Sequence, residues 1–131
     1  MEIRIAASPA EAAEHARLIV TCTASRAPLL FASDVRDGTH ISAVGSDGPG
    51  KQELEPAILQ RAALLLADSR RQCEKLGELQ HAPTEWQRAR EIGDFCVKPP
   101  ALDPDAVTVC DFTGLGVEDL YIAEYCYQRS L

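Results

Sequence analysis

The stretch Thr39-His-Ile-Ser-Ala-Val-Gly-Ser-Asp-Gly-Pro-Gly-Lys51 decides the fold class, because a strand-like run leads directly into a loop. We predict that residues 39–44 form a strand. Five of the six residues from Gly45 to Gly50 are Gly, Pro or Asp, which are residue types that form tight turns. In open parallel sheets, ligands bind beyond the carboxyl ends of the strands. This loop is therefore a candidate site.

The same pattern of strands, loops and helices extends in both directions along the chain. The predicted strands are 2–7, 18–23, 39–44, 63–67 and 107–111. The predicted helices are 8–17, 55–60, 68–79, 84–92 and 117–129, and the connections are 28–35, with one helical turn, and 98–104. Strands that alternate with helices indicate an α/β fold with a mostly parallel sheet, here of about five strands.

Two local signals support this assignment. In the stretch Ser8-Pro9-Ala10-Glu11, Ser8 caps free backbone amides, Pro9 fits the first helical position, and Glu11 completes a capping box. The run 18–23 lacks polar alternation, so we expect a strand that is covered on both faces. The final helix, 117–129, spaces its apolar residues as an amphipathic helix does.

The composition excludes several classes of function. A chain of 131 residues fits one domain, and its net charge of −7 argues against binding to nucleic acid or to an anionic membrane surface. Apolar runs such as 62–67 are too short to span a bilayer. The first residues show no basic segment followed by an apolar stretch, so we expect no signal peptide.

The five cysteines indicate a reducing environment. They are Cys22, Cys73, Cys96, Cys110 and Cys126. Their odd number and the absence of Cys-x-x-Cys or Cys/His ligand spacing predict neither a disulfide framework nor a zinc site. Cys22 and Cys110 lie in apolar runs and are expected to be buried. We therefore expect a reduced, cytoplasmic protein.

Three of the predicted strands end in small or polar residues, at 21–25, 45–51 and 111–114. Topology alone would bring these loops to one edge of the sheet. Asp47 stands among glycines, where a partly desolvated carboxylate can act as a general acid/base. Asp also closes turns for purely structural reasons, and the spacing alone favours that role.

Other polar residues near these loops have two readings each. Lys51 either pairs with a phosphate or ribose or is solvated, which is the usual state of Lys. The Thr23 hydroxyl either reaches a cofactor or bonds to nearby backbone. Asp68 is either a helix cap or a residue of the crevice, and Asp111 and Thr113 are ambiguous in the same way.

The three histidines give no candidate for a catalytic base. His40 lies inside a predicted strand and is expected to be a core residue or to support the site from behind. His15 and His81 are expected on helix surfaces.

Taken together, four segments resemble the ornithine cyclodeaminase/mu-crystallin family of NAD(P)-dependent enzymes and their relatives. They are 18–30, 38–54, 67–70 and 107–120. The block Ala43-Val-Gly-Ser-Asp-Gly-Pro-Gly-Lys51 is the most specific of these matches. The resemblance implies that Asp47 is the catalytic acid/base. It also implies contacts with NAD or NADP from Thr23, Val44, Gly45, Ser46, Asp47 and Lys51, with Thr113 near the nicotinamide and the substrate.

The resemblance covers only the later part of the family's sequence. In family members, the preceding residues supply a dimerisation domain, the substrate clamp and two strands joined by a Gly-x-Gly-x-x-Gly turn that seats the pyrophosphate. That turn does not occur here. The resemblance therefore implies a truncated Rossmann-like three-layer sandwich, a single partial NAD(P)-binding domain at 1–131, with little catalytic competence or cofactor binding alone.

This truncation has consequences for the sheet. The first predicted strand must pair differently, be lost, or be replaced by an edge from another copy. Because exposed strand edges favour association, we expect a homodimer. The alternative is half of a split NAD(P)-dependent cyclodeaminase, amino-acid dehydrogenase or ketimine reductase that a partner chain completes.

Overall fold

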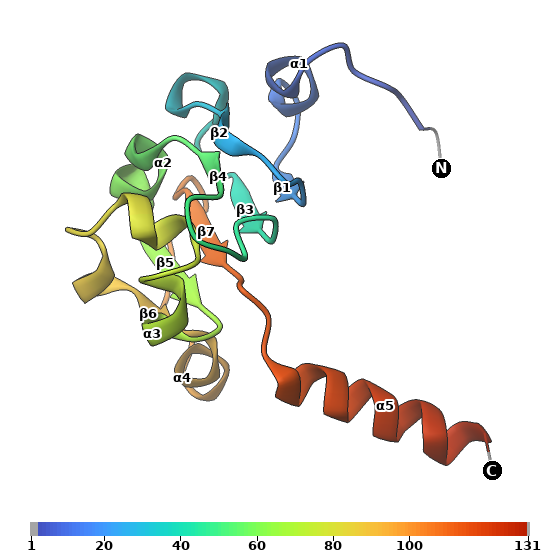
Figure 1. Cartoon of the computed structure of the whole chain (residues 1–131). Coiled ribbons are helices and arrows are strands. Elements are labelled where there is room, and N and C mark those ends of the chain that lie inside the picture. The colour runs from blue at the N-terminus through green and yellow to red at the C-terminus, as the bar shows by residue number, and fades with distance from the viewer. Residues whose placement is uncertain (1–2, 131) are drawn as a thin grey trace.

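The structure, a computed structural model, describes residues 3–130 and confirms the α/β fold. Its main sheet has five parallel strands in the order β1-β3-β7-β5-β6 (Figure 1). In that order they are β1 Leu18–Thr21, β3 His40–Ala43, β7 Thr108–Asp111, β5 Leu64–Ala67 and β6 Arg90–Glu91. A second parallel pair consists of β2 Arg26–Leu30 and β4 Gln52–Leu54.

Helices and 3-10 turns connect these strands. The helices are α1 Pro9–Ala13, α2 Pro56–Arg61, α3 Arg70–Cys73, α4 Ile92–Val97 and α5 Gly116–Ser130. The 3-10 turns are η1 Ala32–Asp34, η2 Glu78–His81 and η3 Trp86–Arg88. In the described part of the chain, no helix is both long enough and apolar enough to cross a membrane.

The core lies on both faces of the central strands. On one face, Ile41, Leu65 and Val109 pack with buried residues of α2 and η2. On the other face, alternate residues of β5 and β7 pack against Phe95 of α4. Burial on both faces explains why the run Leu64–Ala67 is continuously apolar.

The predicted helix start at Ser8 is confirmed. The Glu11 amide donates to the Ser8 hydroxyl at 3.1 Å, and the Glu11 carboxylate accepts the Ala7 amide at 2.7 Å. The predicted end near residue 17 is wrong, because α1 stops at Ala13. By Arg17 the chain has joined the sheet, since the Arg17 carbonyl accepts the His40 amide at 2.9 Å.

The predicted strand at 2–7 does not form over residues 3–7, and Glu2 lies outside the described residues. Ile3 and Ile5 are 81% and 97% exposed. Over residues 3–7 the chain forms no strand of the sheet. Of the three outcomes considered, the single chain shows the loss of this strand, and an edge borrowed from another copy stays a prediction.

The prediction that residues 18–23 are covered on both faces is also wrong. Leu18 and Val20 are 65% and 61% exposed, and the strand ends at Thr21. Within residues 3–130, β1 pairs only with β3, so its other edge carries no strand. Cys22 is exposed in consequence, whereas Cys110 is buried as predicted.

Three other elements differ from the predictions because distant contacts determine them. The connection 28–35 contains the predicted helical turn, which is η1. Its first residues belong to β2, which pairs with β4, and neither of these strands was predicted. The helix predicted at 68–79 is shortened to α3, with a separate turn at η2. The helix predicted at 84–92 is replaced by η3 and by the strand β6, which pairs with β5. Helix α4, which follows β6, was not predicted.

The final helix forms as predicted but does not pack against the domain. In Figure 1, α5 extends away from the sheet as a separate arm, and none of its residues is buried. Its exposed apolar side chains include Leu120, Tyr121, Ile122 and Tyr125.

Candidate functional site

The ends of four neighbouring strands lie at the same level in the sheet. Ala43 of β3 is aligned with Thr21 of β1 and with Asp111 of β7, and Asp111 is aligned with Ala67 of β5. The loops that follow these residues therefore start side by side. This confirms the predicted convergence of the three polar loops at one edge and adds the loop at Asp68.

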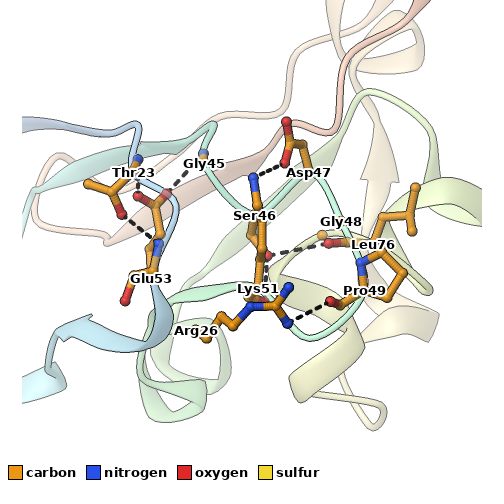
Figure 2. A network of polar contacts seen from close by, with 12 residues as sticks. Thr23, Arg26, Gly45, Ser46, Asp47, Gly48, Pro49, Lys51, Glu53 and Leu76 are labelled. Atoms are coloured by element: carbon orange, nitrogen blue, oxygen red, sulfur yellow. Dashed lines mark hydrogen bonds and ion pairs between the residues drawn. The ribbon is translucent and has the colours of Figure 1, made fainter.

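The loop after β3 presents Asp47 to solvent. The Asp47 side chain is 53% exposed and forms an ion pair with Lys51, whose side chain is 27% exposed (Figure 2). The hydrogen bond from Lys51 lowers the pKa of Asp47, so the carboxylate is ionised at neutral pH. In this state Asp47 can accept a proton. Lys51 is neither fully solvated nor unpaired, because its amine binds Asp47.

The residues before Asp47 differ in what they offer a ligand. Val44 is partly exposed, whereas Gly45 and Ser46 are buried. The Ser46 hydroxyl donates to the Lys51 carbonyl at 2.9 Å and lies 3.3 Å from the Leu76 carbonyl. Its side chain therefore closes the loop from inside.

Thr23, in the loop after β1, is exposed at the same edge. Its hydroxyl oxygen accepts the Ser25 amide at 3.2 Å, which is the nearby-backbone bond that the sequence left open. Its own amide donates to the Glu53 carboxylate at 2.6 Å. The loop is therefore fixed by its backbone, with the side chain on the solvent side.

Glu53 is a residue of the site that sequence reasoning missed. It is fully buried in β4, and its second carboxylate oxygen accepts the Gly45 amide at 2.9 Å. One carboxylate thus joins the loops after β1 and β3 (Figure 2). The sequence Lys51-Gln-Glu-Leu54 gives no signal of this, because glutamate usually lies on the surface.

Two more buried carboxylates stand behind Glu53. Glu78 accepts the amides of Glu53 and Leu54 at 2.7 and 3.1 Å. Asp111 accepts the amides of Glu78 and Leu79 at 2.9 and 3.0 Å. Burial raises the pKa of Glu78 to about 7 and the pKa of Asp111 to about 6, against the lowering effect of these hydrogen bonds.

A fourth buried carboxylate, Asp68, holds the loop after β7. It accepts the amides of Thr113 and Gly114 at 2.8 and 2.7 Å, and the Thr113 hydroxyl at 3.1 Å. The N-cap of α3 is Ser69, so the predicted capping role of Asp68 is wrong. Thr113 is half-buried at the edge where the resemblance places it.

Of the three histidines, His81 contacts a loop of this edge, whereas His40 lies at the other end of its strand. His40 is the first residue of β3, at the opposite end of the strand from the loops, and its Nδ1 lies 2.7 Å from the Thr108 hydroxyl. Burial lowers its pKa. His15 is exposed as predicted, whereas His81 is half-buried and its Nε2 lies 2.7 Å from the Lys51 carbonyl. Over residues 3–130, no group of three or more His, Cys, Asp or Glu side chains is arranged to hold a metal ion.

The comparison with known families agrees with this geometry. The model of the ornithine cyclodeaminase/mu-crystallin family matches residues 1–131, which is the whole chain. The chain belongs to this family.

Individual family members show how much of a full-length protein the chain covers. An uncharacterized cyclodeaminase from Sinorhizobium fredii is 39% identical over 93% of this chain and 39% of its own length. The structure of an archaeal alanine dehydrogenase dimer with bound NAD superposes with a TM-score of 0.80 at 35% identity, over 92% of this chain and 40% of that one. The iminosuccinate reductase of Paracoccus denitrificans, in complex with NAD+, gives a TM-score of 0.74 at 38% identity, over 82% and 34%. The chain thus spans about two fifths of the length of these relatives.

Proposed function

We propose that this family member handles the nicotinamide end of NAD or NADP, and that it is not catalytically competent by itself. The observation that carries the proposal is the level alignment of β1, β3 and β7, whose loops meet beside the exposed, ionised Asp47. Similarity to two proteins whose structures contain NAD supports the choice of cofactor.

The residues at this edge suit such a ligand. Thr23, Val44 and Asp47 are exposed there, and Lys51 and Thr113 lie beside them. A side chain at Gly45 would fill the space between the loops, because a Cβ there would lie 2.4 Å from the Thr23 carbonyl oxygen. Bound NAD or NADP would supply hydride-transfer chemistry. In our proposal, Asp47 moves protons at the substrate, and Lys51 keeps it ionised between turnovers.

The proposed lack of competence rests on the residues that a dinucleotide needs elsewhere. The chain has no Gly-x-Gly-x-x-Gly sequence, which in open α/β domains places free amides against the pyrophosphate. The relatives compared above are more than twice as long as this chain, because the chain matches only 39% and 40% of their lengths. The alternative is that a partner chain completes a split cyclodeaminase, dehydrogenase or ketimine reductase.

Saturation-transfer NMR and calorimetry with NAD+, NADH and NADP+ test this function. Weak transfer from the nicotinamide protons to the wild-type chain, without turnover of amino acids, is expected. A variant that blocks the edge, Val44→Arg, should abolish the transfer, whereas the exposed variant Arg36→Ala, which lies before β3 at the opposite end of the sheet, should not. Transfer confined to the adenine protons, or none at any concentration, would refute the proposal.

We also propose that the chain forms a homodimer. Support comes from the outer edge of β1, where exposed Leu18 and Val20 border an apolar groove of about 350 Å3 between α1, β1 and β2. Exposed edges of this kind favour association. Size-exclusion chromatography with light scattering should give twice the mass of one chain, and Val20→Lys should convert the dimer to a monomer. A monomeric wild type would refute the dimer and favour the split-enzyme alternative.

A reducing, cytoplasmic location is the last part of the proposal. Every cysteine of the chain is a free thiol, and three of them, Cys22, Cys96 and Cys126, are exposed. Exposed thiols persist in compartments that keep cysteine reduced. Fractionation of cells that produce the tagged chain, with thiol alkylation before lysis, tests this location; recovery of the chain as a disulfide-linked species would contradict it.

A further inference from the structure

Glu53 is buried without a charged partner, which is unusual for a glutamate. Its Oε1 accepts the Thr23 amide at 2.6 Å, and its Oε2 accepts the Gly45 amide at 2.9 Å. Each oxygen therefore serves a different loop. Figure 2 shows the carboxylate between Thr23 and Gly45.

The position of Glu53 is itself fixed by buried acids. Glu78 bonds to the backbone of Glu53 and Leu54, and Asp111 bonds to the backbone that carries Glu78. Asp111 is the last residue of β7. A continuous chain of hydrogen bonds thus runs from the end of β7 to the loops that follow its neighbour β3 and the next strand, β1.

Glycine at position 45 is a requirement of this arrangement. A Cβ at Gly45 would lie 2.5 Å from the Glu53 carboxyl carbon, a distance that real contacts do not show. Gly77 has the same relation to Asp111, since a Cβ there would lie 2.3 Å from its Oδ2. Both carboxylates therefore approach backbone that carries no side chain.

We infer that Glu53 is a positioning residue of the candidate site, which sets the spacing between the Thr23 loop and the Gly45–Lys51 loop through its two oxygens. Glu78 and Asp111 orient Glu53 and do not touch the loops themselves. The inference rests on the proposed function in one respect only, namely that these two loops bind the cofactor.

The chemistry of a carboxylate makes the role specific. The glutamine side chain has one acceptor oxygen, so Glu53→Gln retains one of the two hydrogen bonds. Its NH2 group, which is a donor, then faces the other backbone amide. A buried donor left without an acceptor opens more readily, by a factor of about ten or more. Glu55→Gln is a matched control, because Glu55 lies two residues away and bonds to the Ala32 amide, outside both loops.

Amide hydrogen exchange measured by NMR tests the inference in the full chain. In Glu53→Gln, exchange at Thr23 or Gly45, whichever amide then faces the side-chain NH2 group, should accelerate by about tenfold relative to the core amide of Val109. Glu55→Gln should leave that ratio unchanged. If all three amides accelerate equally in Glu53→Gln, the residue acts only on global stability and the inference fails.

Two further measurements separate the outcomes. If Glu53→Gln does not fold, the wild-type Thr23 and Gly45 amides must exchange as slowly as strand amides, and fast exchange at either one overturns the inference. In a calorimetric NAD+ titration, Glu53→Gln should weaken binding at least tenfold, whereas Glu55→Gln should not. An unchanged Kd overturns positioning. Absence of wild-type binding, with the exchange contrast intact, overturns the proposed function and leaves the positioning role standing.

Discussion

Raising the pH from 5 to 8 should destabilise the chain, because two of its buried carboxyl groups hold protons in the folded state. Burial raises the pKa of Glu78 from 4.5 to about 7 and the pKa of Asp111 from 3.8 to about 6. The charged groups that face Glu78 are Asp111 and Glu53, and Asp68 faces Asp111. All are acids, so no cation offsets the burial.

The direction of this pH dependence follows from how many protons the folded and unfolded states bind. Between pH 4.5 and 7 the folded chain retains the Glu78 proton and the unfolded chain releases it. The free energy of unfolding is therefore highest below about pH 4.5 and declines as the pH rises through 7. A pKa raised from 4.5 to about 7 corresponds to about 3 kcal/mol, and Asp111 adds a smaller amount over a lower window because the two groups interact.

Urea unfolding between pH 5 and 8 measures this loss, with the single tryptophan, Trp86, as the fluorescent probe. A decline of about 2 to 4 kcal/mol is expected. Asp47 and Glu85, whose pKa values are lowered by Lys51 and Arg88, titrate in the acid and act outside this range. His40, whose pKa is lowered by burial, acts within the range and opposes part of the decline. Glu78→Gln should remove most of the slope, whatever it does to the absolute stability. A free energy of unfolding that is constant or rising from pH 5 to 8 would refute the reasoning.

Four substitutions test the loops directly by the free energy of unfolding in urea. Gly45→Ala should cost about 1 to 3 kcal/mol because the new Cβ meets a backbone carbonyl, whereas Gly48→Ala, whose Cβ would lie 3.7 Å from the nearest side-chain atom, should be neutral. Equal effects of the two would contradict the close approach. Asp68→Asn should cost about 1 to 3 kcal/mol, because the Asp68 carboxylate accepts hydrogen bonds from two amides and a hydroxyl of the Thr113 loop. Amide exchange in that loop should accelerate. Unchanged exchange would argue against these hydrogen bonds. Asp47→Asn should change stability by less than about 0.5 kcal/mol, because the side chain is exposed, and a larger loss would assign Asp47 a structural role.

The sequence was sufficient to predict the strands that make up the centre of the sheet. β5 is an apolar run, β3 and β7 place apolar residues among polar ones, and all three are followed by turn or capping residues. β2, β4 and β6 are short, and they form because distant residues pair with them. Residues 3–7 show the converse case, in which a strand-like pattern does not form a strand of the sheet.

The residues of the candidate site also fall into those that local sequence predicts and those that depend on distant contacts. The position of Asp47 follows from the strand and turn that precede it, so it was predictable. The burial of Glu53, Glu78 and Asp68 was not, because each accepts at least one amide that is 24 or more residues away in sequence. A carboxylate in such a position has no local signature, since its burial depends on how loops from different strands meet.

The buried acids also determine which part of a dinucleotide this edge suits. The amides after β1 and β3 donate to Glu53, and those after β7 donate to Asp68, so these donors are already used. A phosphate needs free amides or cations and would here face carboxylates instead. An uncharged or positively charged ring does not compete with Glu53 and Asp68 for those amide donors. A positively charged ring is also stabilised by nearby negative charge, including that of Asp47. The same network that holds the loops in place thus directs the pyrophosphate elsewhere, which is why we assign only the nicotinamide end of the cofactor to this chain.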